Sequence, residues 1–272
     1  MIRTTTKDLL RPWIPRPLRR AYSTTREGLY KARLRVAQAR DRWAITSLQY
    51  RELGTLQFAE RRRLVRRLAS VNADVFCAHK HAEMAEMVTA MLALPAATPG
   101  CVVEAGCFKG GSTVKLSVVA KLVGRRLVVF DSFEGLPKHG EDHGRTIFGE
   151  QTGFVPGLYA GALEEVTDNV RRFGEIDVCE FRKGWFDDTM PKFSEPIAAA
   201  FLDVDLAAST RTCLAYLYPL LVPGGVIFSH DGHLPLCMAV FRDASLWREI
   251  GGPPPVFSGL GTRKLISIMK PQ

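Results

Sequence analysis

Three titratable residues directly follow an apolar run near the C-terminal end of the chain. The sequence IFSHDGH, residues 227–233, places His230, Asp231 and His233 after the run 226–228. Imidazole and carboxylate groups at such a position are typical of a metal site, of a catalytic acid–base cluster, or of the polar end of a buried strand. The elements around this segment have to decide between the three.

These elements alternate between apolar runs and helical patterns. Apolar strands separated by helices indicate a parallel sheet covered on both faces. The last two runs are joined only by Thr262 and Arg263, too short for a crossover helix, so we expect an antiparallel hairpin there. The predicted fold is α/β: a Rossmann-like, doubly wound, mostly parallel sheet with an antiparallel C-terminal strand, which resembles class I methyltransferases. The runs are 101–106, 126–131, 177–184, 197–205, 224–231, 256–261 and 264–270, and the helical patterns are 82–94, 112–123, 161–173, 208–221 and 234–248.

A glycine-containing turn follows the first of these strands. The sequence EAGCFKGGS runs from Glu104 to Ser112, and a helix begins there. Gly106 and Gly110 allow the backbone to turn sharply and to approach a ligand closely, and Ser112 can cap the helix or bond the ligand. The pattern ExGxxxG has fewer glycines than the GxGxxG of dinucleotide-binding enzymes, which fits a ligand without a pyrophosphate.

The second strand ends in Asp131 and Ser132, 25 residues after Gly106. An acidic residue at this position can accept hydrogen bonds from both ribose hydroxyls of a nucleoside. Together with the glycine turn, it favours S-adenosylmethionine as the cofactor. Trp185 follows the third strand, and two interpretations of it stay open: it lies along the adenine, or it packs in the core.

Six segments then occur in one order with natural spacing: VVEAGCFKGGST, VVFDSFEGLP, LYAGALEEVTDNVRRFG, RKGWFDDTMP, FLDVDLAAST and LYPLLVPGGVIFSHD. Together they resemble the macrocin O-methyltransferase family, enzymes that methylate sugar hydroxyls of natural products, over residues 75–270. DSFEGLP and GWFDDT are specific because they are not general features of methyltransferases. The resemblance implies a class I fold, S-adenosylmethionine and usually a divalent metal, commonly magnesium.

The resemblance also implies roles for individual residues. Asp203 would be a metal ligand and a candidate base, and the family's pair of metal-binding aspartates falls on His230 and Asp231. We therefore predict Asp203, His230 and Asp231 as metal ligands, with Asp203 and His230 as the catalytic residues. Two departures stand out: the family's Asp-Asp pair is His230-Asp231 here, and its DxDxYEST has Ala207 and Ala208 in place of tyrosine and glutamate. The implied cofactor-binding residues are Glu104, Gly106, Phe108, Gly110, Ser112, Asp131, Ser132 and Trp185.

Methyl transfer to an alcohol needs help in removing the hydroxyl proton, because the pKa of an alcohol is far above neutral. A divalent cation can supply that help by binding the hydroxyl oxygen. Magnesium prefers oxygen ligands, which Asp203 and Asp231 offer, with Asp205 as a candidate third. Three interpretations of His230 stay open: a ligand of manganese or another softer metal, a general base with a pKa near neutral, or a structural histidine. His233 is expected to cap a helix or to contact substrate.

Basic residues are concentrated at the N-terminal end. Residues 1–70 hold 18 Lys and Arg against 5 Asp and Glu, whereas the other 202 residues hold 19 against 23. We predict a basic, mainly helical extension over residues 1–70 and a methyltransferase domain over residues 71–272. The extension packs on a neighbouring subunit in one interpretation, which favours a homo-oligomer. In the other it binds nucleic acid or an anionic membrane surface.

The chain has no apolar run long enough for a membrane span and no signal-peptide pattern, so we expect a cytoplasmic protein. Its six scattered cysteines contain no CxxC pair and are expected to be reduced. The polar stretch 137–160, with His139, His143 and Arg145, is expected to be an active-site lid or a plain loop.

The predicted function is therefore an S-adenosylmethionine-dependent O-methyltransferase acting on a small glycosylated acceptor, a natural product or a glycolipid, with no stable nucleic-acid partner. One alternative is a nucleic-acid methyltransferase that uses the basic N-terminus. Adenine N6 methylation is disfavoured, because residues 203–206 read DVDL and not an NPPY-like tetrad. The other alternative is a non-catalytic protein on a methyltransferase fold.

Overall fold

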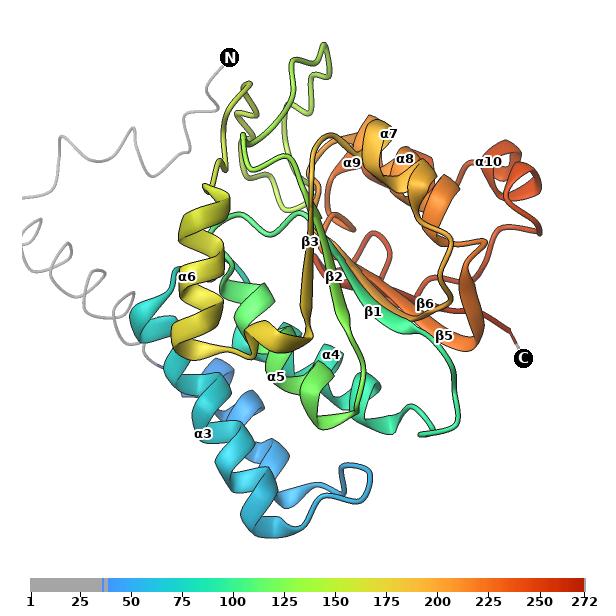
Figure 1. Ribbon diagram of the computed structural model, residues 1–272. Helices are drawn as coiled ribbons and strands as arrows, with labels where there is room; N and C mark the ends of the chain where they lie inside the picture. The colour runs from blue at the N-terminus through green and yellow to red at the C-terminus, as the bar shows by residue number, and fades with distance from the viewer. Residues whose placement is uncertain (1–35, 37–38, 272) are drawn as a thin grey trace, which may run out of the picture.

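Six strands form one sheet at the centre of the molecule, in the order β3-β2-β1-β4-β5-β6 (Figure 1). The structure is a computed structural model that describes residue 36 and residues 39–271. Strands β1 to β5 run parallel, and β6 pairs antiparallel with β5. This arrangement confirms the predicted α/β fold. The strands are β1 (Cys101–Ala105), β2 (Leu127–Asp131), β3 (Cys179–Lys183), β4 (Ile197–Leu202), β5 (Leu221–Ser229) and β6 (Ile266–Met269).

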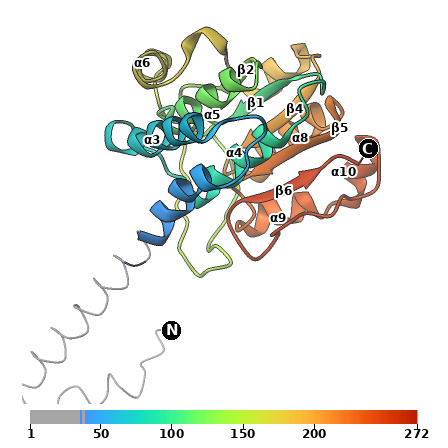
Figure 2. The ribbon, with the colours of Figure 1, turned by 90° about the horizontal axis from the view of Figure 1, so that it is seen from below.

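Helices cover both faces of this sheet, so the molecule has three layers (Figures 1 and 2). Successive residues of a strand point to opposite faces. Val102 therefore belongs to the apolar cluster on one face and Val103 to the cluster on the other. One face carries α3 (Phe58–Asp74), α4 (His81–Ala93), α5 (Gly111–Leu122) and α6 (Leu163–Phe173), and the other carries α7 (Phe186–Thr189), α8 (Ala207–Leu217), α9 (Pro235–Phe241) and α10 (Ala244–Glu249). Short 3-10 helices lie at Ser47–Tyr50, Ile176–Val178 and Met190–Lys192.

The predicted C-terminal hairpin is wrong in one respect. Residues 256–261 are not a strand, and they pair with β6 through the isolated bridge between Ser258 and Ser267. Gly259 and Gly261 have φ of +85° and +75°, a left-handed conformation that interrupts extended backbone. The antiparallel partner of β6 is therefore β5.

One predicted helix is divided in two. The pattern over 234–248 is α9 followed by α10, and the carboxylate of Asp243 accepts hydrogen bonds from the first N–H groups of α10. Such a side-chain cap begins a new helix. The pattern over 208–221 ends earlier than predicted, because Leu221 already belongs to β5.

The predicted boundary near residue 70 falls inside α3, which is continuous from Phe58 to Asp74. Its buried residues Leu64 and Leu68 share an apolar cluster with Met84 of α4. Residues 1–35 and 37–38 of the predicted helical extension lie outside the described residues, and the division into extension and domain stays a prediction. Within the described part of the chain, no helix is both long enough and apolar enough to cross a membrane.

Candidate functional site

A cavity of about 720 Å³ lies at the carboxyl ends of the parallel strands. Doubly wound sheets hold their ligands at this edge, and the volume is in the range of small-molecule sites. The turns after five strands contribute to its wall. Its lining includes Gly106, Phe108, Ser112, Asp131, Ser132, Trp185, Asp203, Asp205, His230 and His233.

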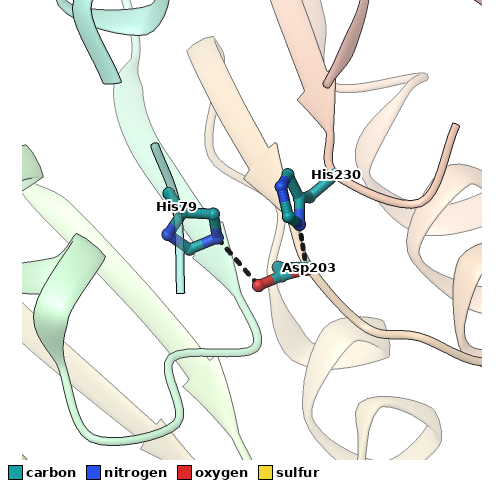
Figure 3. A group of neighbouring side chains, drawn as sticks. All are labelled: His79, Asp203 and His230. Carbon is teal, nitrogen blue, oxygen red and sulfur yellow. Dashed lines mark hydrogen bonds and ion pairs between the residues drawn. The ribbon is translucent and has the colours of Figure 1, made fainter. Parts of the chain in front are cut away.

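Asp203 follows β4 and contacts one histidine through each carboxylate oxygen (Figure 3). Its Oδ2 is 2.9 Å from Nε2 of His79, and its Oδ1 is 3.3 Å from Nδ1 of His230. The two imidazole rings meet edge to face, with centroids 4.7 Å apart. Nε2 of His230 also lies 3.3 Å from Oε2 of Glu83, in the first turn of α4. Imidazole and carboxylate groups thus alternate in space, in the order His79, Asp203, His230 and Glu83.

His79 and His230, the two histidines that contact Asp203, are held in the charged form. Burial alone would lower the pKa of His79, but the carboxylate of Asp203 outweighs burial and raises it to about 10. Burial also opposes the charged form of His230, yet Asp203 and Glu83 raise its pKa to about 9. In return, the two imidazoles outweigh the desolvation of Asp203 and hold its pKa well below its usual range. At neutral pH a carboxylate therefore lies between two imidazolium ions.

Two further carboxylates lie beside Asp203. Oxygen atoms of Asp203, Asp205 and Asp231 all lie within 4.8 Å of one another. Asp231 is 1% exposed and accepts a hydrogen bond from the backbone N–H of Val204. Burial, together with the charge of Asp203, raises the pKa of Asp231 to about 7, and the same causes raise the pKa of Asp205. Carboxylates this close repel one another, so the three oxygens form a donor set suited to a hard divalent cation.

The predicted metal set of Asp203, His230 and Asp231 is therefore brought together only in part. Asp203 contacts His230 and lies beside Asp231. His230 is not part of the oxygen set: with His79 and Asp203 it forms a second group of possible ligands, whose ligand atoms lie within 4.8 Å of one another. Asp205, expected only as a candidate third ligand, completes the oxygen set.

The turn after β1 approaches Asp203 through its backbone. A Cβ on Gly106 would lie 2.0 Å from the carbonyl oxygen of Asp203, and Gly106 has a φ of +83°, so only glycine fits. Phe108 and Ser112 lie on the cavity wall beside it. Gly110 is not part of that wall: it is the N-cap residue of α5 and lies against Val166 of α6.

Glu104, in β1, is fully buried and is not among the residues that line the cavity. Among the described residues, its two carboxylate oxygens have no hydrogen-bond partner of regular geometry. Burial raises its pKa to about 7, although the hydroxyls of Ser112 and Thr113 favour its charged form. A buried carboxylate without a partner is costly, which points to a group supplied from outside the chain.

Asp131, Ser132 and Trp185 also line the cavity. The carboxylate of Asp131 accepts hydrogen bonds of 2.7 Å from the N–H groups of Cys107 and Phe133, and its remaining lone pairs are available to a ligand. The hydroxyl of Ser132 is used within the turn after β2. Trp185 is 38% exposed on the cavity wall, which favours ligand contact over the core interpretation.

The stretch 137–160 forms a large part of the cavity wall, as a lid would. Of the residues singled out in it, His139 lines the cavity. His143 is buried and contacts Glu141, and Arg145 donates to a carbonyl of the same stretch. His233 lines the cavity from the other side and stacks on an aromatic residue of the stretch.

Glu141 fixes this stretch to the start of α8. Its carboxylate accepts hydrogen bonds of 2.7 and 2.8 Å from the N–H groups of Ala207 and Ala208. These are the two positions at which the sequence departs from DxDxYEST. A carboxylate at a helix N-terminus is stabilised by the helix macrodipole, and these two bonds lower the pKa of Glu141 despite its desolvation.

Sequence reasoning missed His79 and Glu83. His79 lies 124 positions before its partner Asp203, next to a segment whose only marked property was an apolar helical period. The available signal was the polar run HKHAE at residues 79–83, between two helical patterns. That run alone indicates a helix start and not a contact with a distant strand end.

The chain is similar to known proteins in sequence and in fold. A family model described as macrocin-O-methyltransferase (TylF) matches residues 49–253. The solved structure of the O-methyltransferase NovP is similar with a TM-score of 0.55 and 23% identity, over 79% of this chain and 82% of that chain. This similarity supports the fold.

Two curated relatives match part of the chain. The Streptomyces olivaceus protein named 8-demethyl-8-(2,3-dimethoxy-alpha-L-rhamnosyl)-tetracenomycin-C 4'-O-methyltransferase is 34% identical over 168 residues, 60% of this chain and 64% of the relative. The Micromonospora griseorubida protein named mycinamicin III 3''-O-methyltransferase is 32% identical over 152 residues, 53% of this chain and 60% of the relative. The chain thus matches less than two thirds of the length of these relatives. The family model covers most of this chain, and the chain belongs to the macrocin O-methyltransferase (TylF) family.

Proposed function

We propose that the protein is an S-adenosylmethionine-dependent O-methyltransferase that methylates a sugar hydroxyl of a glycosylated natural product. The observation that carries this proposal is the position of Asp203, whose carboxylate lines the same cavity as the turns after β1 and β2. Family membership supports methyl transfer to oxygen. The names of the relatives, one of them a rhamnosyl-tetracenomycin methyltransferase, support a glycosylated acceptor.

The residues around the cavity fit the cofactor. Asp131 would accept hydrogen bonds from the ribose hydroxyls, and Trp185 would lie along the adenine. The turn from Gly106 to Ser112 would hold the methionine part. An amino group at this turn would favour the charged form of Glu104, whose buried oxygens lack a hydrogen-bond partner among the described residues.

The oxygens of Asp203, Asp205 and Asp231 fit a divalent cation. When bound, such a cation would supply Lewis acidity that lowers the pKa of the acceptor hydroxyl. An all-oxygen donor set favours magnesium, whereas the predicted participation of His230 favoured manganese or another softer metal.

Asp203 is the residue that we place against the acceptor hydroxyl. The two imidazolium groups make its carboxylate a weak base, so it would accept a hydrogen bond from the hydroxyl and orient it, while a bound cation would lower the pKa of the hydroxyl. The hydroxyl loses its proton as its oxygen displaces the sulfur from the methyl carbon. The Asp203 carboxylate faces the cavity, and His79 and His230 fix its orientation. Because His230 is protonated at neutral pH in this arrangement, its role is to hold Asp203 and to balance its charge, not to act as the first base.

The test combines binding and turnover. Calorimetry of the full-length protein with S-adenosylhomocysteine is expected to show saturable binding that Asp131→Ala removes. With a panel of deoxysugar glycosides as acceptors, Asp203→Asn is expected to bind S-adenosylhomocysteine normally and to lose at least ~100-fold in methyl transfer. Asp188→Asn is the matched control, because Asp188 is exposed and lies outside the cavity lining. A wild-type protein that does not bind S-adenosylhomocysteine, or a fully active Asp203→Asn variant, would contradict the proposal.

A chelator tests the role of the cation. Loss of turnover in EDTA, with recovery on adding magnesium, supports the cation at Asp203, Asp205 and Asp231. Undiminished turnover in EDTA rejects the cation and leaves the orientation of the hydroxyl by Asp203.

We also propose that the protein acts in the cytoplasm and as a homo-oligomer. All six cysteines are free thiols, which fits a reducing compartment. The basic residues 1–70 would supply the contacts between subunits. Light scattering on the full-length protein is the test of assembly, and a monomer at every concentration would reject it.

A further inference from the structure

Lys115 is a buried cation beside a thiol. It belongs to α5 and is fully buried. Its Nζ donates to Oδ1 of Asn72, in α3, and lies 3.3 Å from Sγ of Cys77. Of these two partners only Cys77 can become an anion. Because an ammonium group buried without a counter-charge is costly, Lys115 favours the thiolate form of Cys77.

Two other neighbours act in the same direction. Sγ of Cys77 lies 3.7 Å from Nδ1 of His79, whose Nε2 holds Asp203. Cys77 also lies against the N-terminus of α5, where a Cβ on Gly111 would be 2.9 Å from the Cα of Cys77. The positive end of a helix favours a thiolate. Burial would raise the pKa of Cys77, but the effects of His79 and Lys115 outweigh it and lower the pKa to about 7.

Cys77 is half-buried and lines the cavity together with Gly106 and Ser112. Cys107 lines the same cavity but is only 3% exposed, and burial raises its pKa well above 9. The cavity therefore holds one thiol beside two cationic side chains and one thiol without them, which serves as an internal control.

We propose that Cys77 is a reactive thiolate and a covalent modification site for low-molecular-weight disulfides that enter the cavity. The thiolate sulfur attacks one sulfur of the disulfide, the S–S bond of the reagent breaks, and the released thiolate takes a proton from solvent. The product is a mixed disulfide on Cys77, with no further oxidant needed. Lys115 and His79 hold the attacking sulfur in its anionic form.

A consequence follows that rests on the proposed function. The group added to Cys77 projects beside the turn from Gly106 to Ser112, where the methionine part of the cofactor would lie. It also takes the thiolate away from His79, and so changes the charge next to Asp203. Modification is therefore expected to block cofactor binding, and thiol reagents in the cell would switch the enzyme off reversibly.

The first experiment measures thiol reactivity without any cofactor. The full-length protein is treated with iodoacetamide between pH 5.5 and 9, and each cysteine is followed by peptide mass spectrometry. Cys77 is expected to react at pH 7 at least ~10-fold faster than Cys107, with a half-maximal rate near pH 7. A Cys77 rate that equals that of Cys107, or that reaches half-maximum only near pH 8.5 as in an unfolded peptide, overturns the proposal.

Variants at Lys115 show whether the charge is the cause. Lys115→Met is expected to slow Cys77 alkylation at pH 7 by roughly 5-fold and to move its pH midpoint upward by about one, whereas Lys115→Arg keeps the charge and the reactivity. If Lys115→Met does not fold, the comparison of Lys115→Arg with wild type, and of Cys77 with Cys107, still decides. Unchanged alkylation in a folded Lys115→Met variant contradicts the role of the buried cation.

The last experiment separates this inference from the proposed function. Cystamine is expected to form a mixed disulfide at Cys77 that dithiothreitol removes, and saturating S-adenosylhomocysteine is expected to slow its formation at least ~10-fold. If S-adenosylhomocysteine binds the protein but does not slow a rapid modification of Cys77, the thiolate is supported and its position beside the cofactor is refuted. A protein that reacts at Cys77 and binds no S-adenosylhomocysteine refutes the proposed function and leaves the modification site intact.

Discussion

Replacing His79 by glutamine removes one of the two cations that hold Asp203. The side chain of His79 is 4% exposed, and its Nε2 lies 2.9 Å from Oδ2 of Asp203. Glutamine can still donate a hydrogen bond, but it carries no charge. We expect His79→Gln to lower the free energy of unfolding, and the loss to depend on pH in one direction.

The magnitude follows from the pKa of His79, which rises from 6.5 to about 10 on folding. A difference of one in pKa corresponds to about 1.4 kcal/mol, so the charge of His79 contributes at most roughly 5 kcal/mol to stability. The variant keeps His230 beside Asp203, and we therefore expect a loss of about 2 to 3 kcal/mol. Because the pKa is raised in the folded state, this contribution is complete below pH 6.5 and is lost as the pH rises through about 10.

The assay is urea unfolding followed by circular dichroism, in EDTA so that no metal contributes. At pH 6 the variant is expected to be about 2 to 3 kcal/mol less stable than wild type, and at pH 9.5 the difference is expected to fall below about 1 kcal/mol. A difference that stays the same at both pH values would refute the reasoning, because it would show that the ring packs at this position without carrying a charge.

His81→Gln is the matched control for this experiment. His81 begins α4 two positions further on, and its backbone N–H donates to Asp41. Burial lowers the pKa of His81, so its ring carries no stabilising charge at pH 6. The difference between this variant and wild type is expected not to shrink from pH 6 to pH 9.5.

Two further predictions concern the backbone around β1. Gly106→Ala is expected to lower the free energy of unfolding by at least about 3 kcal/mol, because its Cβ would meet the carbonyl oxygen of Asp203 at 2.0 Å. Gly124→Ala is the control: Gly124 has a φ of +67° but no atom within 4 Å of its Cβ, and the loss is expected to be only about 1 kcal/mol. Equal losses in chemical denaturation would show that the contact is not what excludes a side chain. Arg125→Met is expected to lower the free energy of unfolding by about 2 kcal/mol, because it removes the side-chain donor of the Thr98 and Gly100 carbonyls and one of two donors to the Pro95 carbonyl. Thermal unfolding measures this loss, and an unchanged melting temperature would rule out the anchoring role.

The strands and the meeting of Asp203 with Asp231 were predictable for one physical reason. A parallel strand covered on both faces has to be apolar along its length, and its carboxyl end has to lie beside that of its neighbour. The prediction of an antiparallel hairpin between 256–261 and 264–270 was wrong, because an apolar run indicates that a segment is buried but does not show which strand it pairs with. The last strand, β6, pairs with the edge of β5. The left-handed backbone at Gly259 and Gly261 keeps residues 256–261 from forming a strand of the sheet.

The rest of the site depends on packing that local patterns do not encode. His79 reaches Asp203 because α4 packs beneath it with α3 and α5 on one face of the sheet, and no spacing in the sequence links positions 79 and 203. The charge state of His230 was likewise beyond prediction. A pKa near neutral was one interpretation of His230, but Asp203 and Glu83 together raise its pKa to about 9. No pattern in the sequence links Glu83 with His230; only the packing of α4 brings them together.

The contact between Glu141 and α8 links a surface loop to the exchange of backbone protons at the site. The N–H groups of Ala207 and Ala208 have their acceptor 66 and 67 positions away along the chain. When the stretch 137–160 lifts, both amides lose that acceptor and become open to deuterium from solvent. A bound substrate that holds the stretch 137–160 in place is expected to slow deuterium uptake at these two amides. Glu141→Ala is expected to speed this uptake even without a ligand. Deuterium uptake at the Ala207 and Ala208 amides would therefore report on the contact between Glu141 and the start of α8.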